Sequence, residues 1–150
     1  MTRVAYSLRP STEDDLPFIA KLGRANRAAE AQRHIGIESD EPPASIEGRF
    51  RPGRDWIVTN DDVQIGVLSL DRRPDAVVVR HIALMPEFQN RGIGSALIRG
   101  VLDFAVTAKL PVRLRLVKDN PARSLYERLG FTVTAEDDQR YEMTARPTAS

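Results

Sequence analysis

A strand, a glycine-containing turn and a helix follow one another in mid-chain, and this succession constrains the fold most strongly. Ala76–Leu84 is the run richest in β-branched residues, and Pro86 ends it. Apolar residues then recur three and four positions apart over Ile93–Ala108, which predicts one buried face of a helix. Val112–Val117 predicts the next strand. A sheet with a helix packed on it accommodates this order, so we expect an α/β fold.

The flanking sequence predicts further strands and helices. Thr12 with Asp15 three residues later is typical of a helix start. Two β-prone runs around Asp61-Asp62 predict a hairpin. In chain order the additional elements are a strand at Val4–Leu8, a helix from Thr12 to about Gln32, a short helix near Ser45–Phe50, hairpin strands at Trp56–Asn60 and Val63–Leu70, a helix at Pro121–Leu129, and strands at Phe131–Ala135 and Gln139–Thr144. The sheet is therefore expected to be mixed.

Size and charge narrow the domain organisation and the partners. The 150 residues suit one domain spanning 1–150, with a core at about 4–144 and a flexible tail over 145–150. A net charge of +1 gives no basic excess for nucleic acid or membranes. The chain has no cysteine, and no His/Asp/Glu cluster suggests a metal. Without an apolar leader or membrane-length run, we expect a cytoplasmic protein with no metal, nucleic-acid partner or membrane partner.

The turn before the central helix has the chemistry of a phosphate cradle. The first N–H groups of a helix lack internal partners, and the helix dipole makes this end partly positive. Gly92 and Gly94 carry no Cβ that would keep a phosphate away, and Arg91 adds a guanidinium donor. Neither a P-loop nor a dinucleotide fingerprint fits, because no Gly-Lys-Ser/Thr follows and Leu97 stands where a third glycine would be needed. A plain glycine turn into a helix is the structural alternative.

Two sequence blocks resemble a known enzyme family. Gln89-Asn90-Arg91-Gly92-Ile93-Gly94 resembles the Q/R-x-x-G-x-G/A signature of the GNAT N-acetyltransferase superfamily, and Ile82–Pro86 resembles the strand that precedes it. Asn120–Phe131 resembles the family's N-x-x-A-x-x-x-Y-x-x-x-G-F element. One predicted helix and one predicted strand separate the two blocks, as in the family, and the match spans roughly Val4–Met143. The resemblance implies a single N-acetyltransferase domain with a mostly antiparallel central sheet, splayed between its fourth and fifth strands and flanked by helices.

The resemblance also implies acetyl-CoA as co-substrate. The pantetheine arm would pair with the backbone of the fourth strand, and the pyrophosphate would lie on the cradle. The implied cofactor-binding residues are Ile82, Ala83, Leu84, Gln89, Asn90, Arg91, Gly92, Ile93, Gly94, Ser95, Asn120, Ala122 and Tyr126. Several have structural alternatives: Ile82, Leu84 and Tyr126 suit a core, and Asn120 before Pro121 suits a helix N-cap.

The catalytic roles implied by the resemblance fall on three residues. The Leu84 N–H would stabilise the oxyanion, and the Tyr126 hydroxyl would protonate the departing CoA thiolate. His81 is a candidate general base, with proton loss through solvent as the default. Strict alternation puts Arg80 on one face with Ile82 and Leu84, and His81 on the opposite face, unless a bulge reverses the pattern.

Two further residues are expected near the acceptor. Arg80 in the cleft would favour an acceptor that carries a carboxylate or phosphate, although a surface cation is the alternative. Glu47 lies in the stretch from Arg33 to Arg54, which usually shapes acceptor specificity in such folds, and could attract an amine or act as the base. A solvated charged loop is the simpler interpretation of this stretch.

We therefore expect an N-acetyltransferase that moves the acetyl group of acetyl-CoA to a primary amine by direct attack in a ternary complex. No cysteine is present to form an acyl-enzyme. The acceptor is a small-molecule or peptide amine, with polyamines, amino acids, antibiotics, peptide N-termini and protein lysines all open. A homodimer also stays open, since dimers are common in the family. The alternatives are a non-catalytic acetyl-CoA-binding sensor and a nucleotide-binding α/β domain.

Overall fold

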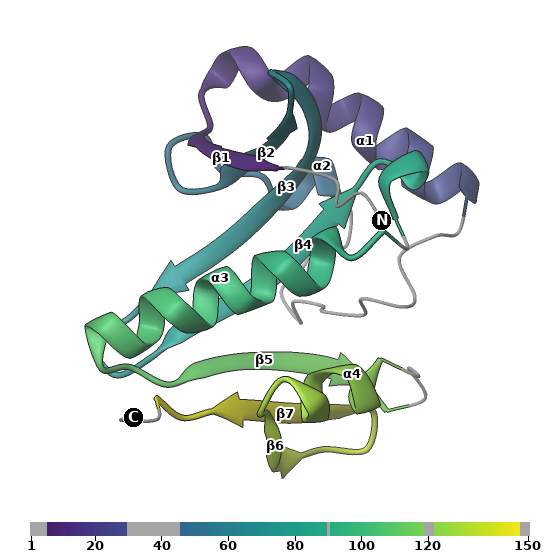
Figure 1. Ribbon diagram of the computed structural model, residues 1–150. Coiled ribbons are helices and arrows are strands. Elements are labelled where there is room, and N and C mark those ends of the chain that lie inside the picture. The colour runs from purple at the N-terminus through teal and green to yellow at the C-terminus, as the bar shows by residue number, and fades with distance from the viewer. Residues whose placement is uncertain (1–5, 30–45, 90, 119–121, 148–150) are drawn as a thin grey trace.

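The β-prone runs form one seven-stranded sheet in the computed structural model, which describes residues 6–29, 46–89, 91–118 and 122–147 (Figure 1). Short 3-10 turns at Glu13–Asp15 and Pro86–Phe88 precede α1 and α3. The elements are β1 (Ser7–Pro10), α1 (Leu16–Ala29), α2 (Ile46–Arg49), β2 (Trp56–Asn60), β3 (Val63–Arg72), β4 (Val77–Leu84), α3 (Ile93–Ala108), β5 (Val112–Val117), α4 (Arg123–Arg128), β6 (Thr132–Glu136) and β7 (Arg140–Ala145).

The sheet is mixed and splayed, as the resemblance implies. Its strand order is β1-β2-β3-β4-β5-β7-β6, and every neighbouring pair is antiparallel except β4 and β5. Within these two described strands the parallel pairing is confined to Val77 with Val112 and Val78 with Arg113. Beyond these pairs β4 and β5 diverge toward their C-terminal ends, where α4 and the start of α3 lie (Figure 1).

Helices cover both faces of the sheet. Apolar residues of α1, including Ile19 and Leu22, pack on one face against Ile57, Val67 and Ala83. On the opposite face the buried side of α3 packs into a larger core that continues under α4 and β5–β7. Figure 1 shows α3 crossing in front of β4. Among the helices in the described parts of the chain, none is long and apolar enough to cross a membrane.

Local sequence signals account for several element boundaries. Thr12 and Asp15 form the expected capping box, and Asp15 also pairs with Arg9 through Oδ1 at 2.6 Å. Asp61 and Asp62 both have positive φ, as a two-residue hairpin turn requires. The boundaries of α3 and β5 coincide with those predicted. The first strand runs later than predicted, because β1 covers Ser7–Pro10, and residues 4 and 5 lie outside the described ranges.

A β-bulge changes the predicted facing of residues in β4. Ser69 pairs with His81 but Leu70 pairs with Val79, so Arg80 is an extra residue opposite the β3 strand. The bulge resets the alternation, and Val79 and Ile82 both pack into the α3-side core. His81 shares the opposite face with its partner Ser69. The strict alternation that grouped Arg80 with Ile82 and Leu84 was therefore wrong, and the bulge that the sequence left open is present.

Candidate active site

The end of β4 directs part of its backbone toward the side from which β5 diverges. The Met85 N–H donates to the Ile65 carbonyl of β3 at 2.8 Å. Antiparallel partners alternate between hydrogen-bonded and non-hydrogen-bonded positions, so the backbone groups of Leu84 and Ile82 point away from β3. Ala83 lies between them and points its backbone toward β3. Of the three residues expected to contact a pantetheine arm, Ile82 and Leu84 therefore have the suitable orientation.

Two buried amide side chains hold the Leu84 carbonyl. Asn26 of α1 donates to this oxygen through Nδ2 at 3.0 Å, and Gln89 donates to it through Nε2 at 3.0 Å. Gln89 Nε2 also donates to Asn26 Oδ1 at 3.0 Å, and its own backbone N–H bonds to the Pro86 carbonyl. Both lone pairs of the Leu84 carbonyl are thus used, while its N–H faces the diverging side. Gln89, which was expected to contact the cofactor, is buried and helps to orient the end of β4 from inside the protein.

The start of α3 offers backbone donors. Gly92 is the N-cap residue with φ of 82°, and among the described residues no side chain caps the helix here. The first intrahelical bond to this cap comes from the Ala96 N–H, so the preceding N–H groups of the first turn face outward. The Ile93 side chain is buried, whereas Gly94 and Ser95 are half-buried. Outward-facing N–H groups at a helix start are donors that an anion can use.

Arg91 lies on the outer side of this turn. Its side chain is exposed, and its guanidinium carbon lies 5.7 Å from the centroid of the Phe88 ring. An exposed guanidinium held over an aromatic ring remains able to meet an anion. Asn90, which was expected to belong to the same cradle, lies outside the described residues.

Tyr126 lies on α4, and its side chain is buried in the hydrophobic core. Its ring packs edge-to-face on Phe131, with the centroids 5.8 Å apart. Burial raises the pKa of the Tyr126 phenol, so its hydroxyl keeps its proton at neutral pH. Helix α4 begins at Arg123, two residues after the predicted start, with buried Ala122 in the N-cap position. Asn120 lies outside the described residues, so its expected roles as cap or cofactor contact have no structural counterpart here.

His81 belongs to a buried polar cluster on the α1 side of the sheet. Its strand partner Ser69 donates to Asp55 Oδ1 at 2.8 Å, and Arg54 donates to Asp55 Oδ1 at 2.7 Å. Within the described ranges the buried Nε2 of His81 has no hydrogen-bond partner. The pKa of His81 is lowered from 6.5 to about 4, mainly because burial disfavours the charged imidazolium; Asp55 opposes this shift, and neighbouring guanidinium groups, including Arg54, contribute to it. The imidazole is therefore neutral at physiological pH.

Arg80 and Glu47 both lie on the α1 side. Arg80 approaches Asp71 to 3.7 Å and is mostly buried, with 15% of its side chain exposed. Its charge also acts on His81, consistent with a shared face. Glu47 of α2 lies against α1 at Gly23, where an added Cβ would collide with its carboxylate. Arg80 and Glu47 are thus on the side opposite α3.

The family model of the acetyltransferase (GNAT) family matches residues 24–131. The chain belongs to this family. The matched region of this GNAT chain includes the bulged β4, the α3 cradle and Tyr126. No curated protein sequence matches the chain.

Solved structures share the GNAT fold at low sequence identity. A GNAT-family acetyltransferase from Listeria monocytogenes superimposes with a TM-score of 0.73 at 14% identity, covering 97% of this chain and 98% of that one. The ribosomal-protein-alanine N-acetyltransferase from Escherichia coli gives 0.71 at 17% identity, covering 97% and 96%. The PaiA N-acetyltransferase from Thermoplasma acidophilum, solved in complex with coenzyme A, gives 0.69 at 19%, covering 95% and 99%.

Sequence reasoning missed several polar residues that organise this GNAT site. Asn26 follows Phe18 and Leu22 at four-residue spacing, so it is a polar residue on the buried face of α1. That position was the available signal. Asp55 and Ser69 gave no comparable signal, because only the register of β2 and β3 brings them together beside His81.

Proposed function

We propose that the chain transfers an acetyl group from acetyl-CoA to a primary amine by direct attack in a ternary complex. The observation that carries the proposal is the divergence of β4 and β5 beside the start of α3, which no described side chain caps. An extended pantetheine arm would run along the outward-facing backbone of Ile82 and Leu84. Its pyrophosphate would meet the first N–H groups of α3 near Gly92 and the exposed Arg91 guanidinium. Membership of the acetyltransferase (GNAT) family supports this assignment.

The reaction needs one nucleophilic attack and two proton movements. The amine lone pair attacks the thioester carbonyl carbon, and the carbonyl electrons move onto oxygen. The Leu84 N–H is the proposed donor to this oxyanion, since the two amides on the Leu84 carbonyl fix the orientation of the residue. The intermediate collapses by breaking the carbon–sulfur bond, which releases an amide and the CoA thiolate. The amine nitrogen loses one proton, and the thiolate gains one.

Tyr126 is the proposed proton donor to the thiolate. Its raised pKa keeps the hydroxyl protonated, which a donor requires. Removal of the amine proton is assigned to solvent, because His81 with a pKa of about 4 is a weak acceptor for an ammonium proton of pKa about 10.4. His81, Arg80 and Glu47 are proposed to shape the acceptor side of β4.

An acceptor panel tests the proposed function. Purified chain is mixed with acetyl-CoA and, separately, a polyamine, amino acids, an aminoglycoside and short peptides, while free thiol is measured and products are identified by mass spectrometry. We expect amine-dependent thiol release with a gain of one acetyl group on the acceptor. Thermal stabilisation by acetyl-CoA without turnover on any amine would instead favour a binding module. Stabilisation by ATP or NAD but not by acetyl-CoA would contradict the donor assignment.

Replacing Tyr126 by Phe tests the acid. We expect kcat to fall about 100-fold, because general acid catalysis is typically worth that much or more, while KM for acetyl-CoA stays within about twofold. Tyr141→Phe is the matched control, since Tyr141 lies on β7, its ring packs against Lys118 and Arg123, and it has no proposed role. An unchanged kcat in Tyr126→Phe would remove this hydroxyl from the mechanism.

A further inference from the structure

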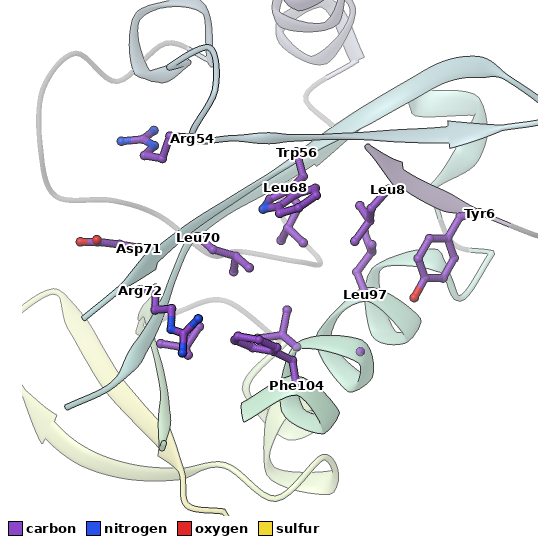
Figure 2. Close-up of a pocket in the computed structure, with 13 residues that line it drawn as sticks. Tyr6, Leu8, Arg54, Trp56, Leu68, Leu70, Asp71, Arg72, Leu97 and Phe104 are labelled. Atoms are coloured by element: carbon purple, nitrogen blue, oxygen red, sulfur yellow. The ribbon is translucent and has the colours of Figure 1, made fainter. Parts of the chain in front are cut away.

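A cavity of about 650 Å³ lies between α3 and the β1–β3 half of the sheet (Figure 2). Leu97 and Phe104 of α3 form one wall, and Leu8, Trp56 and Leu68 of the strands form the other. The proposed donor site uses the first turn of α3 and the last residues of β4, and none of these residues lines the cavity. The cavity is therefore a separate feature of the same helix.

The cavity gathers exposed apolar side chains. Six large apolar residues are exposed in the part of the chain that the structure describes, and three of them line this cavity: Leu8 at 41%, Trp56 at 36% and Phe104 at 44%. Scattered exposed apolar residues are common, but a group of them around one hollow is typical of a binding site. The volume also falls within the range of small-molecule pockets.

One end of the cavity carries an unbalanced positive charge. The Arg72 guanidinium carbon lies 5.3 Å from the centroid of the Phe104 ring, and no described carboxylate lies within ion-pair distance of Arg72. The other charged residues at this end have partners: Asp71 pairs with Arg73 at 3.0 Å and Arg80 at 3.7 Å, and Arg54 pairs with Asp55. Figure 2 shows the Asp71 carboxylate pointing away from the apolar walls, whereas Arg72 lies beside Phe104.

We propose that this cavity binds an amphipathic carboxylate, with its apolar body between Trp56 and Phe104 and its carboxylate on Arg72. An amine would meet the unpaired Arg72 and be repelled. The single positive charge of Arg72 is balanced by the single negative charge of a carboxylate. A small ligand fits better than a protein surface, because the exposed apolar groups surround a hollow and a stable protein interface needs about 800 Å² on each partner.

Trp56 allows a direct binding measurement, since it is the only tryptophan in the chain. Decanoate, decanol and decylamine, each below its micellar concentration, are titrated while tryptophan emission is recorded. We expect a saturable shift with one decanoate per chain, weaker binding of decanol and weakest binding of decylamine. Equal affinity for all three, or no saturable change, would overturn the proposal.

Two variants locate the site. Arg72→Gln should weaken decanoate about tenfold or more and leave decanol within about twofold, as loss of a charge-assisted bond requires. Gly100→Leu should abolish both signals by filling the cavity without harming α3, since leucine favours a helix more than glycine. Arg99→Gln is the matched control, because this exposed arginine lies on α3 outside the cavity. Loss of binding in Arg99→Gln alone would overturn the assignment.

Two controls separate the proposal from other occupants. Saturating acetyl-CoA should leave decanoate affinity unchanged, whereas competition would place decanoate in the donor site. Sedimentation should show the same oligomeric state with and without decanoate. If the Trp56 emission changes with protein concentration as the chain self-associates, and decanoate does not compete, a second copy rather than a carboxylate covers this face.

Discussion

Asn26 and Gln89 show how single side chains orient the backbone at the end of β4. Both side chains donate to the Leu84 carbonyl and are bonded to each other, and both are buried. A fixed carbonyl also fixes the N–H of the same residue, which is the proposed oxyanion donor. Asn26 extends this restraint to α1, so the first helix helps to position the end of β4.

Asn26→Leu removes one of these donors while keeping a similar volume. We expect kcat to fall about tenfold, which corresponds to roughly 1.4 kcal/mol, with KM for acetyl-CoA changed much less. Gln64→Leu is the matched control, because the Gln64 side chain donates its hydrogen bond to Asp15 and not to the Leu84 carbonyl. Steady-state kinetics and urea unfolding are measured on both variants. Equal loss of stability and of kcat in the two variants would show that Asn26 has only a structural role.

His81 should make stability fall in acid. Its folded pKa of about 4 lies below the ordinary 6.5, so below pH 6.5 the unfolded chain binds a proton that the folded chain does not. The loss grows as pH falls from 6.5 to 4 and then levels, reaching about 3 kcal/mol. We expect His81→Gln to remove this part of the pH dependence, measured by urea unfolding at several pH values. The other histidine, His34, supplies the control His34→Gln, and a flatter profile in that variant instead would refute the assignment.

At the scale of elements, β3 and β4 come unusually close beside the site. A Cβ added to Gly66 would lie 2.4 Å from the Ala83 carbonyl oxygen and 2.7 Å from a Leu84 methyl carbon. Gly66 pairs with Leu84, so the absence of a side chain lets β3 support the end of β4 directly.

A pair of glycine-to-alanine changes separates close approach from helix propensity. We expect Gly66→Ala to destabilise the fold by about 1–3 kcal/mol, since backbone atoms must move. Gly100→Ala should stabilise it by about 0.5–1 kcal/mol, because its Cβ would meet only the Tyr6 hydroxyl at 3.5 Å and alanine suits a helix. Free energies of unfolding are compared with the parent chain. Similar values for the two variants would mean that β3 can shift away from β4 at little cost.

The sequence predicts elements better than it predicts how they are joined. The boundaries of α3 and β5 follow from apolar periodicity and from flanking turns, so they were predictable. The bulge at Arg80 depends on pairing with β3, which no local pattern reveals, and it removed Arg80 from the face that Ile82 and Leu84 share. The Asn26–Gln89 contact joins residues 63 positions apart, and the cavity draws its walls from β1, β2, β3 and α3.

At the scale of the whole molecule, the sheet consists of two parts with a narrow connection. Strands β1–β4 carry α1 and lie beneath α3, whereas β5–β7 carry α4. The hydrogen-bonded pairing between the described strands β4 and β5 ends at Val78 and Arg113. Beyond these residues, the pantetheine arm of acetyl-CoA is proposed to lie where a continuous sheet would have its next hydrogen-bonded pairs between β4 and β5.

Hydrogen exchange should therefore report donor binding in a specific place. We expect acetyl-CoA to slow amide exchange at Ile82 and Leu84, whose N–H groups face the diverging side, and at the first turn of α3. Ala83 should change little, because its N–H is directed to β3. Exchange is followed by nuclear magnetic resonance with and without acetyl-CoA. Protection spread evenly over Ile82, Ala83 and Leu84 would contradict the proposed pairing.

The short pairing between β4 and β5 at Val77 and Val112 acts as a hinge between the two halves of the sheet. A small rotation at this hinge changes the spacing between β4 and β5 more at Leu84 than at Val77, because Leu84 is at the other end of β4. The free energy needed to hold β4 and β5 at the spacing that the donor requires is therefore part of the free energy of donor binding. Substitutions at Val77 or Val112 should accordingly alter donor affinity, although neither residue is expected to touch the donor.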